Sequence, residues 1–158
     1  MTSPSVCRCS AVGWMNLREV GAAPGAAAFL TVLARGLGRA GRVSEGLAAI
    51  EQAFMLSERY EEHWCLPELL RNKGELRLFK GSRDALRGAE ECLRQALGWA
   101  SCDGTLAWEL RAAISFARLR RDQGQQAGAR DLLTSVYERF TEGFGTADLR
   151  EAKRLIDA

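Results

Sequence analysis

The 158-residue sequence has little of what most catalytic, nucleic-acid and membrane-bound proteins require. It contains one histidine, three prolines and no hydrophobic run long enough to cross a bilayer, since residues 26–33 are too few. Its 22 basic and 20 acidic residues leave a net charge of only +2, whereas a phosphate footprint needs a concentrated basic surface. No basic segment precedes a continuous hydrophobic core, as it would in a signal peptide. We therefore expect no nucleic-acid or membrane partner and a cytoplasmic location.

The five cysteines form no disulfide framework. They are odd in number and irregularly spaced, which favours reduced thiols. Cys7, Cys9, His63 and Cys65 have the ligand types and number of a zinc site, so a small helical metal or ligand binder is kept as an alternative. The favoured interpretation has no metal and no cofactor.

No enzyme motif is found. His63 lies on a charged linker without a neighbouring Ser or Cys motif. The glycines at 36–41 match a dinucleotide pattern in outline only, because a predicted helix precedes them instead of a strand. The carboxylates lie on helix faces, without a pocket that would separate two pKa values. We expect no catalytic residue.

Residues 66–100 read as two amphipathic helices joined at residues 80–82. The first has a stripe at helical spacing, made of Leu66, Leu69, Leu70, Leu76 and Phe79. Gly81 can end it, and Ser82 or Asp84 can cap the second. Gly74 in mid-helix indicates a close approach of a neighbouring helix.

This pattern recurs on both sides. Five columns align. Offsets of 40 and then 43 residues relate Ala34, Gly74 and Ala117, and Gly41, Gly81 and Gly124. Offsets of 43 and then 40 relate the other three columns: Gly46, Ala89 and Ala129; Ile50, Leu93 and Leu133; Ala53, Ala96 and Val136. Only the loop of the middle unit is longer, by three residues, at a place where lengthening costs little. The chain therefore contains an internal repeat.

The small–large–small columns resemble tetratricopeptide (TPR) repeats, whose paired helices pack small residues against neighbouring backbones. The chain departs from the family at Leu37, Arg77 and Arg120, where an aromatic residue is preferred, and no unit closes with the usual proline. Residues 41–59, 68–79, 89–100 and 109–157 are similar to the C-terminal TPR tail of bacterial signalling proteins that carry a class III adenylate/guanylate cyclase domain or a transcriptional regulatory domain ahead of an ATPase module. This resemblance implies a sensor or scaffold arm and no catalytic residue.

The predicted fold class is all-α, a TPR-like α-solenoid of three helical hairpins and a C-terminal capping helix. Residues 1–25 read as an irregular arm, with one turn expected at 14–20, and residues 26–158 as the repeat domain. The hairpins are expected at 26–59, 64–101 and 105–140, with Leu30, Leu33 and Leu37 pointing inward in the first. A helix over 147–158, capped by Thr146 or Asp148, would cover the end of the stack.

TPR stacks usually bind peptides along the first helices of their hairpins. Projected onto this chain, that wall contains Arg35, Glu68, Arg71, Glu75, Arg111, Arg118 and Arg121. It is basic in the third unit and mixed in the second, and arginine side chains suit the carboxylates of an acidic peptide. The Lys/Asn pattern that some TPR proteins use for a terminal carboxylate is not matched at Thr31 and Arg35. We therefore expect a non-catalytic protein or peptide binder.

The alternative is a fragment of a cyclase or ATPase regulator whose catalytic domains are absent. In that case the first hairpin, around Leu30, Leu33 and Leu37, would expose an apolar surface and the chain would self-associate.

Overall fold

The computed structural model describes residues 25–157, without the side chains of Gln126 and Ala127. These residues form helices and turns and no strand, which confirms the all-α prediction for this part of the chain. The helices are α1 (Ala26–Arg39), α2 (Val43–Arg59), α3 (Leu66–Leu78), α4 (Arg83–Cys102), α5 (Leu106–Asp122), α6 (Gln126–Tyr137) and α7 (Ala147–Asp157), with a short 3-10 turn, η1, at His63–Cys65. The expected arm, including its turn at 14–20, lies outside the described residues apart from Gly25.

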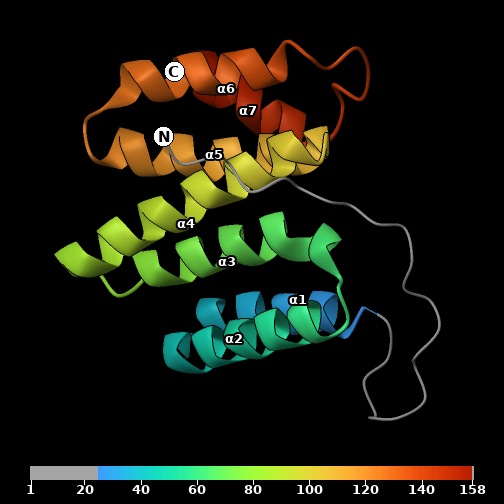
Figure 1. Cartoon of the computed structure of the whole chain (residues 1–158). Coiled ribbons are helices and arrows are strands. Elements are labelled where there is room, and N and C mark those ends of the chain that lie inside the picture. The colour runs from blue at the N-terminus through green and yellow to red at the C-terminus, as the bar shows by residue number, and fades with distance from the viewer. Residues whose placement is uncertain (1–24, 158) are drawn as a thin grey trace, which may run out of the picture.

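The helices pack as successive pairs. The pairs α1–α2, α3–α4 and α5–α6 follow one another in chain order, from α1 and α2 at one end of the molecule to α6 and α7 at the other (Figure 1). The first helix of the second and third pairs contacts both helices of the pair before it: α3 contacts α1 and α2, and α5 contacts α3 and α4. Helix α7 contacts α5 and α6 in the same way, so it occupies the position of one further first helix.

Local signals set the turns between paired helices. The three turn glycines, Gly41, Gly81 and Gly124, have φ of 77°, 65° and 74°, which a side chain would strain. Of the two candidate caps for α4, Ser82 is the one used: its hydroxyl accepts a hydrogen bond of 3.1 Å from the Ala85 amide. At α7, the Thr146 hydroxyl accepts from the Leu149 amide at 3.4 Å.

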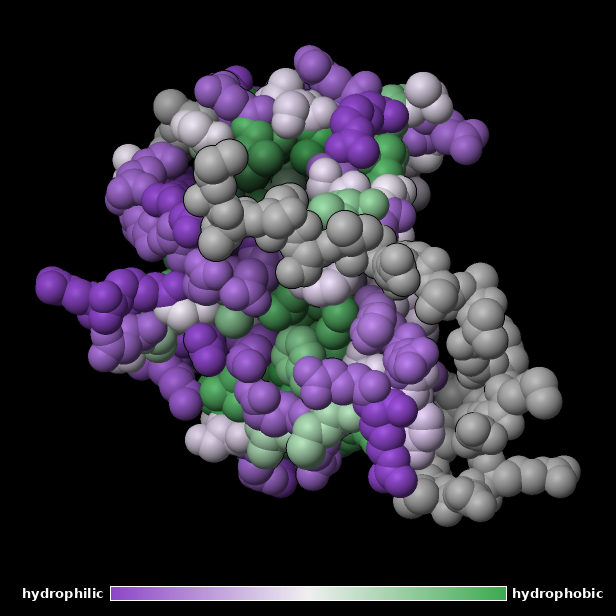
Figure 2. Space-filling view, viewed as in Figure 1, coloured by the Kyte–Doolittle hydropathy of each residue, from purple (hydrophilic) through white to green (hydrophobic). Residues whose placement is uncertain are grey.

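Close helix approach explains the small residues. A Cβ on Gly74 would lie 3.0 Å from Cγ of Leu93 and 3.1 Å from the Ala89 carbonyl oxygen, both on α4. The large residues of the repeat column, Ile50, Leu93 and Leu133, are fully buried. Hydrophobic residues gather between the helices, and hydrophilic ones cover most of the visible surface (Figure 2).

One side chain predicted to point inward does not: Leu33 on α1 is exposed, because no described residue covers that side of the helix. Phe79, the last residue of the predicted stripe on α3, is also exposed, and α3 ends one residue before it at Leu78. No helix among residues 25–157 is long and apolar enough to cross a membrane.

Candidate functional site

The predicted wall residues lie on three first helices that contact one another in order, α1 with α3 and α3 with α5. Arg35 is on α1, Glu68, Arg71 and Glu75 are on α3, and the remaining three arginines are on α5. Their contacts divide them into a buried cluster, a set paired with acidic residues, and one arginine beside a hollow.

Arg71 is the centre of the buried cluster. Its side chain donates from Nε and Nη2 to the two carboxylate oxygens of Glu68, at 2.8 Å each, and from Nη1 to Oε1 of Glu75 at 2.5 Å. The same Nη1 lies 3.3 Å from Oγ of Ser115 on α5, and that hydroxyl donates to Oε1 of Glu75 at 2.7 Å. Asn72 completes the cluster by donating to the Glu68 carbonyl at 2.7 Å. Arg71 is only 5% exposed, so it forms part of the structure between α3 and α5.

The pKa values of Arg71 and Glu68 reflect both their burial and their ion pairing. Burial alone would lower the pKa of Arg71, but its hydrogen bonds and ion pairs with Glu68 and Glu75 raise that pKa above the ordinary value. Burial would likewise raise the pKa of Glu68, and the hydrogen bond from Arg71 outweighs it, so the pKa of Glu68 lies below its usual value. The charged forms of both residues therefore stabilise each other, which is the arrangement of a structural ion pair.

The predicted arginines of α5 are paired with acidic residues, and two of these acidic residues, Asp148 and Glu151, lie on α7. Arg111 lies 3.4 Å from Glu68 and 3.5 Å from Asp148, and Arg118 lies 2.6 Å from Glu151. Arg154 also contacts Glu151, at 2.8 Å. The hydrogen bond from Arg154, together with the bond and charge of Arg118, lowers the pKa of Glu151 to about 2.

The third unit therefore differs from the basic wall that the sequence suggested. Arg121, the last predicted residue, lies 3.6 Å from its neighbour Asp122. The prediction considered α5 by itself, whereas Asp148 and Glu151 of α7 neutralise the two arginines that face that helix.

Arg35 lies in a different environment, at a small hollow between α1 and α3. The hollow has a volume of about 80 Å³ and is lined by Arg35, Arg39, Asn72, Glu75, Leu76 and Phe79. Neither Arg35 nor Arg39 forms an ion pair with another residue that the structure describes. Glu75, the one acidic residue of the lining, is already bound to Arg71 and Ser115. The hollow thus combines two available cations with the exposed ring of Phe79.

Sequence reasoning missed Arg39, Asn72, Phe79 and Ser115 as members of these two groups. A signal for two of them was present, because the repeat offset places Asn72 and Ser115 in the same column. Both are polar and almost fully buried where a stripe residue would ordinarily be apolar.

The possible metal ligands are only partly described. Cys7 and Cys9 lie outside the described residues. Cys65 is buried, and its thiol donates to the Glu62 carbonyl at 3.1 Å, while His63 is exposed. Among residues 25–157 no group of three or more His, Cys, Asp or Glu side chains could hold a metal ion.

Comparison with known proteins adds no further assignment. No family model matches the chain, and no curated protein or solved structure matches it either.

Proposed function

We propose that the chain is a non-catalytic protein-interaction scaffold, a TPR-like α-solenoid that binds an acidic peptide segment across α1 and α3. The repeat supports the solenoid, because each first helix from α3 onward contacts both helices of the pair before it. The proposal fits a sensor or scaffold arm of a bacterial signalling protein, which is the role that the sequence resemblance implies.

The observation that carries the peptide proposal is the hollow beside Arg35 and Arg39. Guanidinium groups bind carboxylates through paired hydrogen bonds, and these two have no acidic partner among the described residues. Leu76 and Phe79 provide an apolar wall next to them. The site is therefore complementary to an acidic side chain followed by an apolar one.

The buried cluster determines how far this site extends. Arg71, Glu75 and Ser115 satisfy one another across α3 and α5, so a peptide would gain little from displacing them. The remaining arginines with an open side toward a ligand are those of α1. Reversing the charge of Arg118 would test this site poorly, because it would place two carboxylates together at Glu151.

The test uses two labelled peptides of about ten residues, a length that suits groove binding. One alternates Glu and Leu, and the other alternates Lys and Leu. Fluorescence anisotropy should show binding of the acidic peptide, and the double variant Arg35→Glu/Arg39→Glu should weaken it at least about 10-fold, since it replaces two charge attractions with two repulsions.

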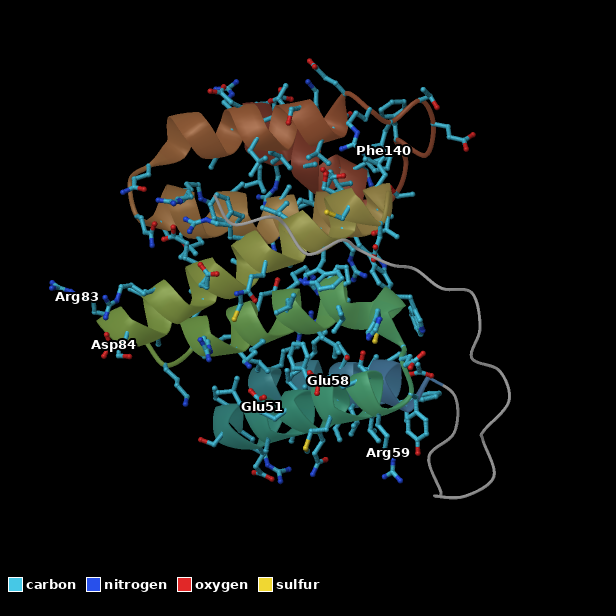
Figure 3. The ribbon with its side chains drawn as sticks, viewed as in Figure 1. Glu51, Glu58, Arg59, Arg83, Asp84 and Phe140 are labelled. Carbon is cyan, nitrogen blue, oxygen red and sulfur yellow. The ribbon has the colours of Figure 1, made fainter. Side chains whose placement is uncertain are left out.

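The matched control is Arg130→Glu/Arg150→Glu, which changes the net charge equally at exposed residues of α6 and α7, two helices that do not line the hollow. Arg83 at the start of α4 (Figure 3) is not used, because it follows Phe79 of the hollow by only one turn of the chain. If both double variants lost the same amount of binding affinity, the effect would come from overall charge and not from the hollow. Equal binding of both peptides would contradict the proposed site.

A further inference from the structure

One face of the first hairpin is apolar and uncovered by the described residues. On α1, Phe29, Val32 and Leu33 are 75%, 68% and 52% exposed, and the stripe continues through the exposed Gly36 and Ala40. On α2, Met55 is 61% exposed. This stripe on α1, from Phe29 to Ala40 at helical spacing, contains no charged residue.

The internal repeat shows what such a face is built for. The offsets of 40 and 43 residues place Phe29, Val32 and Gly36 in the columns of Leu69, Asn72 and Leu76 on α3 and of Ala112, Ser115 and Leu119 on α5. All six of those residues are buried. Leu69 and Leu76 pack into the core formed with α1 and α2, and Ala112 packs against Leu70 and Ala96 of the pair before it. The same face of α1 therefore has the position of a helix surface that a neighbouring hairpin covers.

We propose that this face binds the same face of a second copy, around a two-fold axis that crosses α1 between Val32 and Leu33. The two α1 helices would run antiparallel, and Phe29 of each copy would lie against Gly36 of the other. Gly36 leaves the required space, since a Cβ built on it would have no neighbouring atom within 4 Å. Val32 would lie against Leu33 of the other copy at the axis. The ring of Phe29 would then fill the space beside Gly36 at each end of the contact, and the apolar side chains of Val32 and Leu33 would meet at its centre.

The other end of the molecule does not offer a complementary surface for head-to-tail stacking. The exposed residues of α7 include Arg150, Lys153, Arg154 and Asp157, and its apolar Leu149 and Ala152 are buried against α5 and α6. An interface between unlike ends would bury those charges against the apolar stripe, which is unfavourable. Pairing of like faces closes after two copies.

The size of the face sets the strength of the dimer. Helices of 14 and 17 residues are about 21–25 Å long at 1.5 Å per residue, and two neighbouring helices are about 18–20 Å wide. The footprint is then about 400–500 Å² for each copy, below the roughly 800 Å² of a standard stable interface. The dimer should therefore be weak and dependent on concentration.

The experiment is light scattering coupled to size exclusion on the full chain, under reducing conditions so that exposed thiols such as Cys102 cannot cross-link copies. The measured mass should rise from 17.3 kDa toward twice that value as concentration increases. Val32→Glu and Leu33→Lys should each abolish the rise, because each places like charges close together at the axis. Phe144→Glu, at an exposed residue between α6 and α7, is the matched control and should leave the rise unchanged.

Combining the two substitutions tests the axis itself. In Val32→Glu/Leu33→Lys, the antiparallel arrangement sets opposite charges against each other across the axis, so the dimer should return. Circular dichroism should show the same helix content in all variants, because both positions are exposed. A monomer at every concentration, a series of larger oligomers, a dimer unaffected by Val32→Glu, or a double variant that stays monomeric would each overturn the proposal.

Discussion

Ser115 of α5 donates its hydroxyl to Oε1 of Glu75 on α3 over 2.7 Å, and the same oxygen accepts a hydrogen bond from Arg71 at 2.5 Å. One carboxylate oxygen therefore joins a buried cation to the next helix pair. This bond crosses from the second unit of the repeat to the third, 40 residues away in sequence.

The first prediction concerns Arg71. Arg71→Met keeps much of the side-chain volume and removes the charge, leaving Glu68 and Glu75 without their main partner. We expect the free energy of unfolding to fall by about 2–4 kcal/mol, somewhat less than for a fully buried pair because Glu75 is 30% exposed. Urea denaturation measures it.

The control for Arg71 is Arg87→Met. Arg87 pairs with Asp84 at 2.6 Å, but both side chains are more than three-quarters exposed, so its loss should cost about 0–1 kcal/mol. Similar losses for the two variants would show that the buried cluster contributes little to stability.

The second prediction compares two helical glycines. Gly74→Ala adds a methyl group 3.0 Å from Leu93 and should destabilise the fold by about 1–3 kcal/mol through overpacking. Gly98→Ala on α4 meets no atom within 4 Å and should stabilise it by about 0.5–1 kcal/mol, because alanine favours a helix. Thermal unfolding of both variants measures the contrast, and a stabilising Gly74→Ala would contradict the tight α3–α4 contact.

The third prediction is a pH dependence from Glu151. Its pKa is about 2 in the folded chain, against the ordinary value of 4.5. A carboxyl group with a lowered folded pKa stabilises the fold above its unfolded pKa, and this contribution is lost as the pH falls from about 4.5 toward 2. The urea midpoint of the wild type should therefore drop in this range.

Glu151→Gln removes this titration. Its urea midpoint should be lower than that of the wild type at neutral pH, and the two should converge as the pH falls below about 2, where the wild-type carboxyl becomes protonated as well. Glu142→Gln, at an exposed position in the loop before α7, serves as the control. Parallel curves for Glu151→Gln and the wild type would show that the contacts with Arg118 and Arg154 do not affect stability.

The fourth prediction concerns thiol reactivity. Burial raises the pKa of both Cys65 and Cys92, which lowers their thiolate fraction as well as their access to reagent. Cys102 is exposed at the end of α4. During native alkylation followed by mass spectrometry, Cys102 should react at least about 10-fold faster than the buried pair, and denaturant should remove the difference. Equal native rates would contradict the burial of these two thiols.

The sequence predicts the helices well because each one carries a local signal, whereas the site depends on contacts between helices. Apolar periodicity and the turn glycines are readable within one unit. The pairing of Arg111 with Asp148 requires knowing that α7 lies against α5, and the pairing of Arg71 with Ser115 requires the register of α3 on α5. Periodicity places Leu33 on an apolar face of its helix without showing what covers that face, and in the structure the side chain is exposed.

The bonds between pairs are unevenly distributed along the stack. Hydrogen bonds and ion pairs join α3, α5 and α7. Helix α1 meets α3 through apolar packing, such as Leu76 beside Gly38. Helix α2 reaches α3 through an ion pair, between Glu51 (labelled in Figure 3) and Lys73 at 2.7 Å. Fraying should therefore begin at the α1–α2 end, with its backbone amides exchanging hydrogen for deuterium ahead of those in α3 and α5. A peptide or a second copy bound at this end should then slow the hydrogen–deuterium exchange of the α1 amides, even where the average structure does not change.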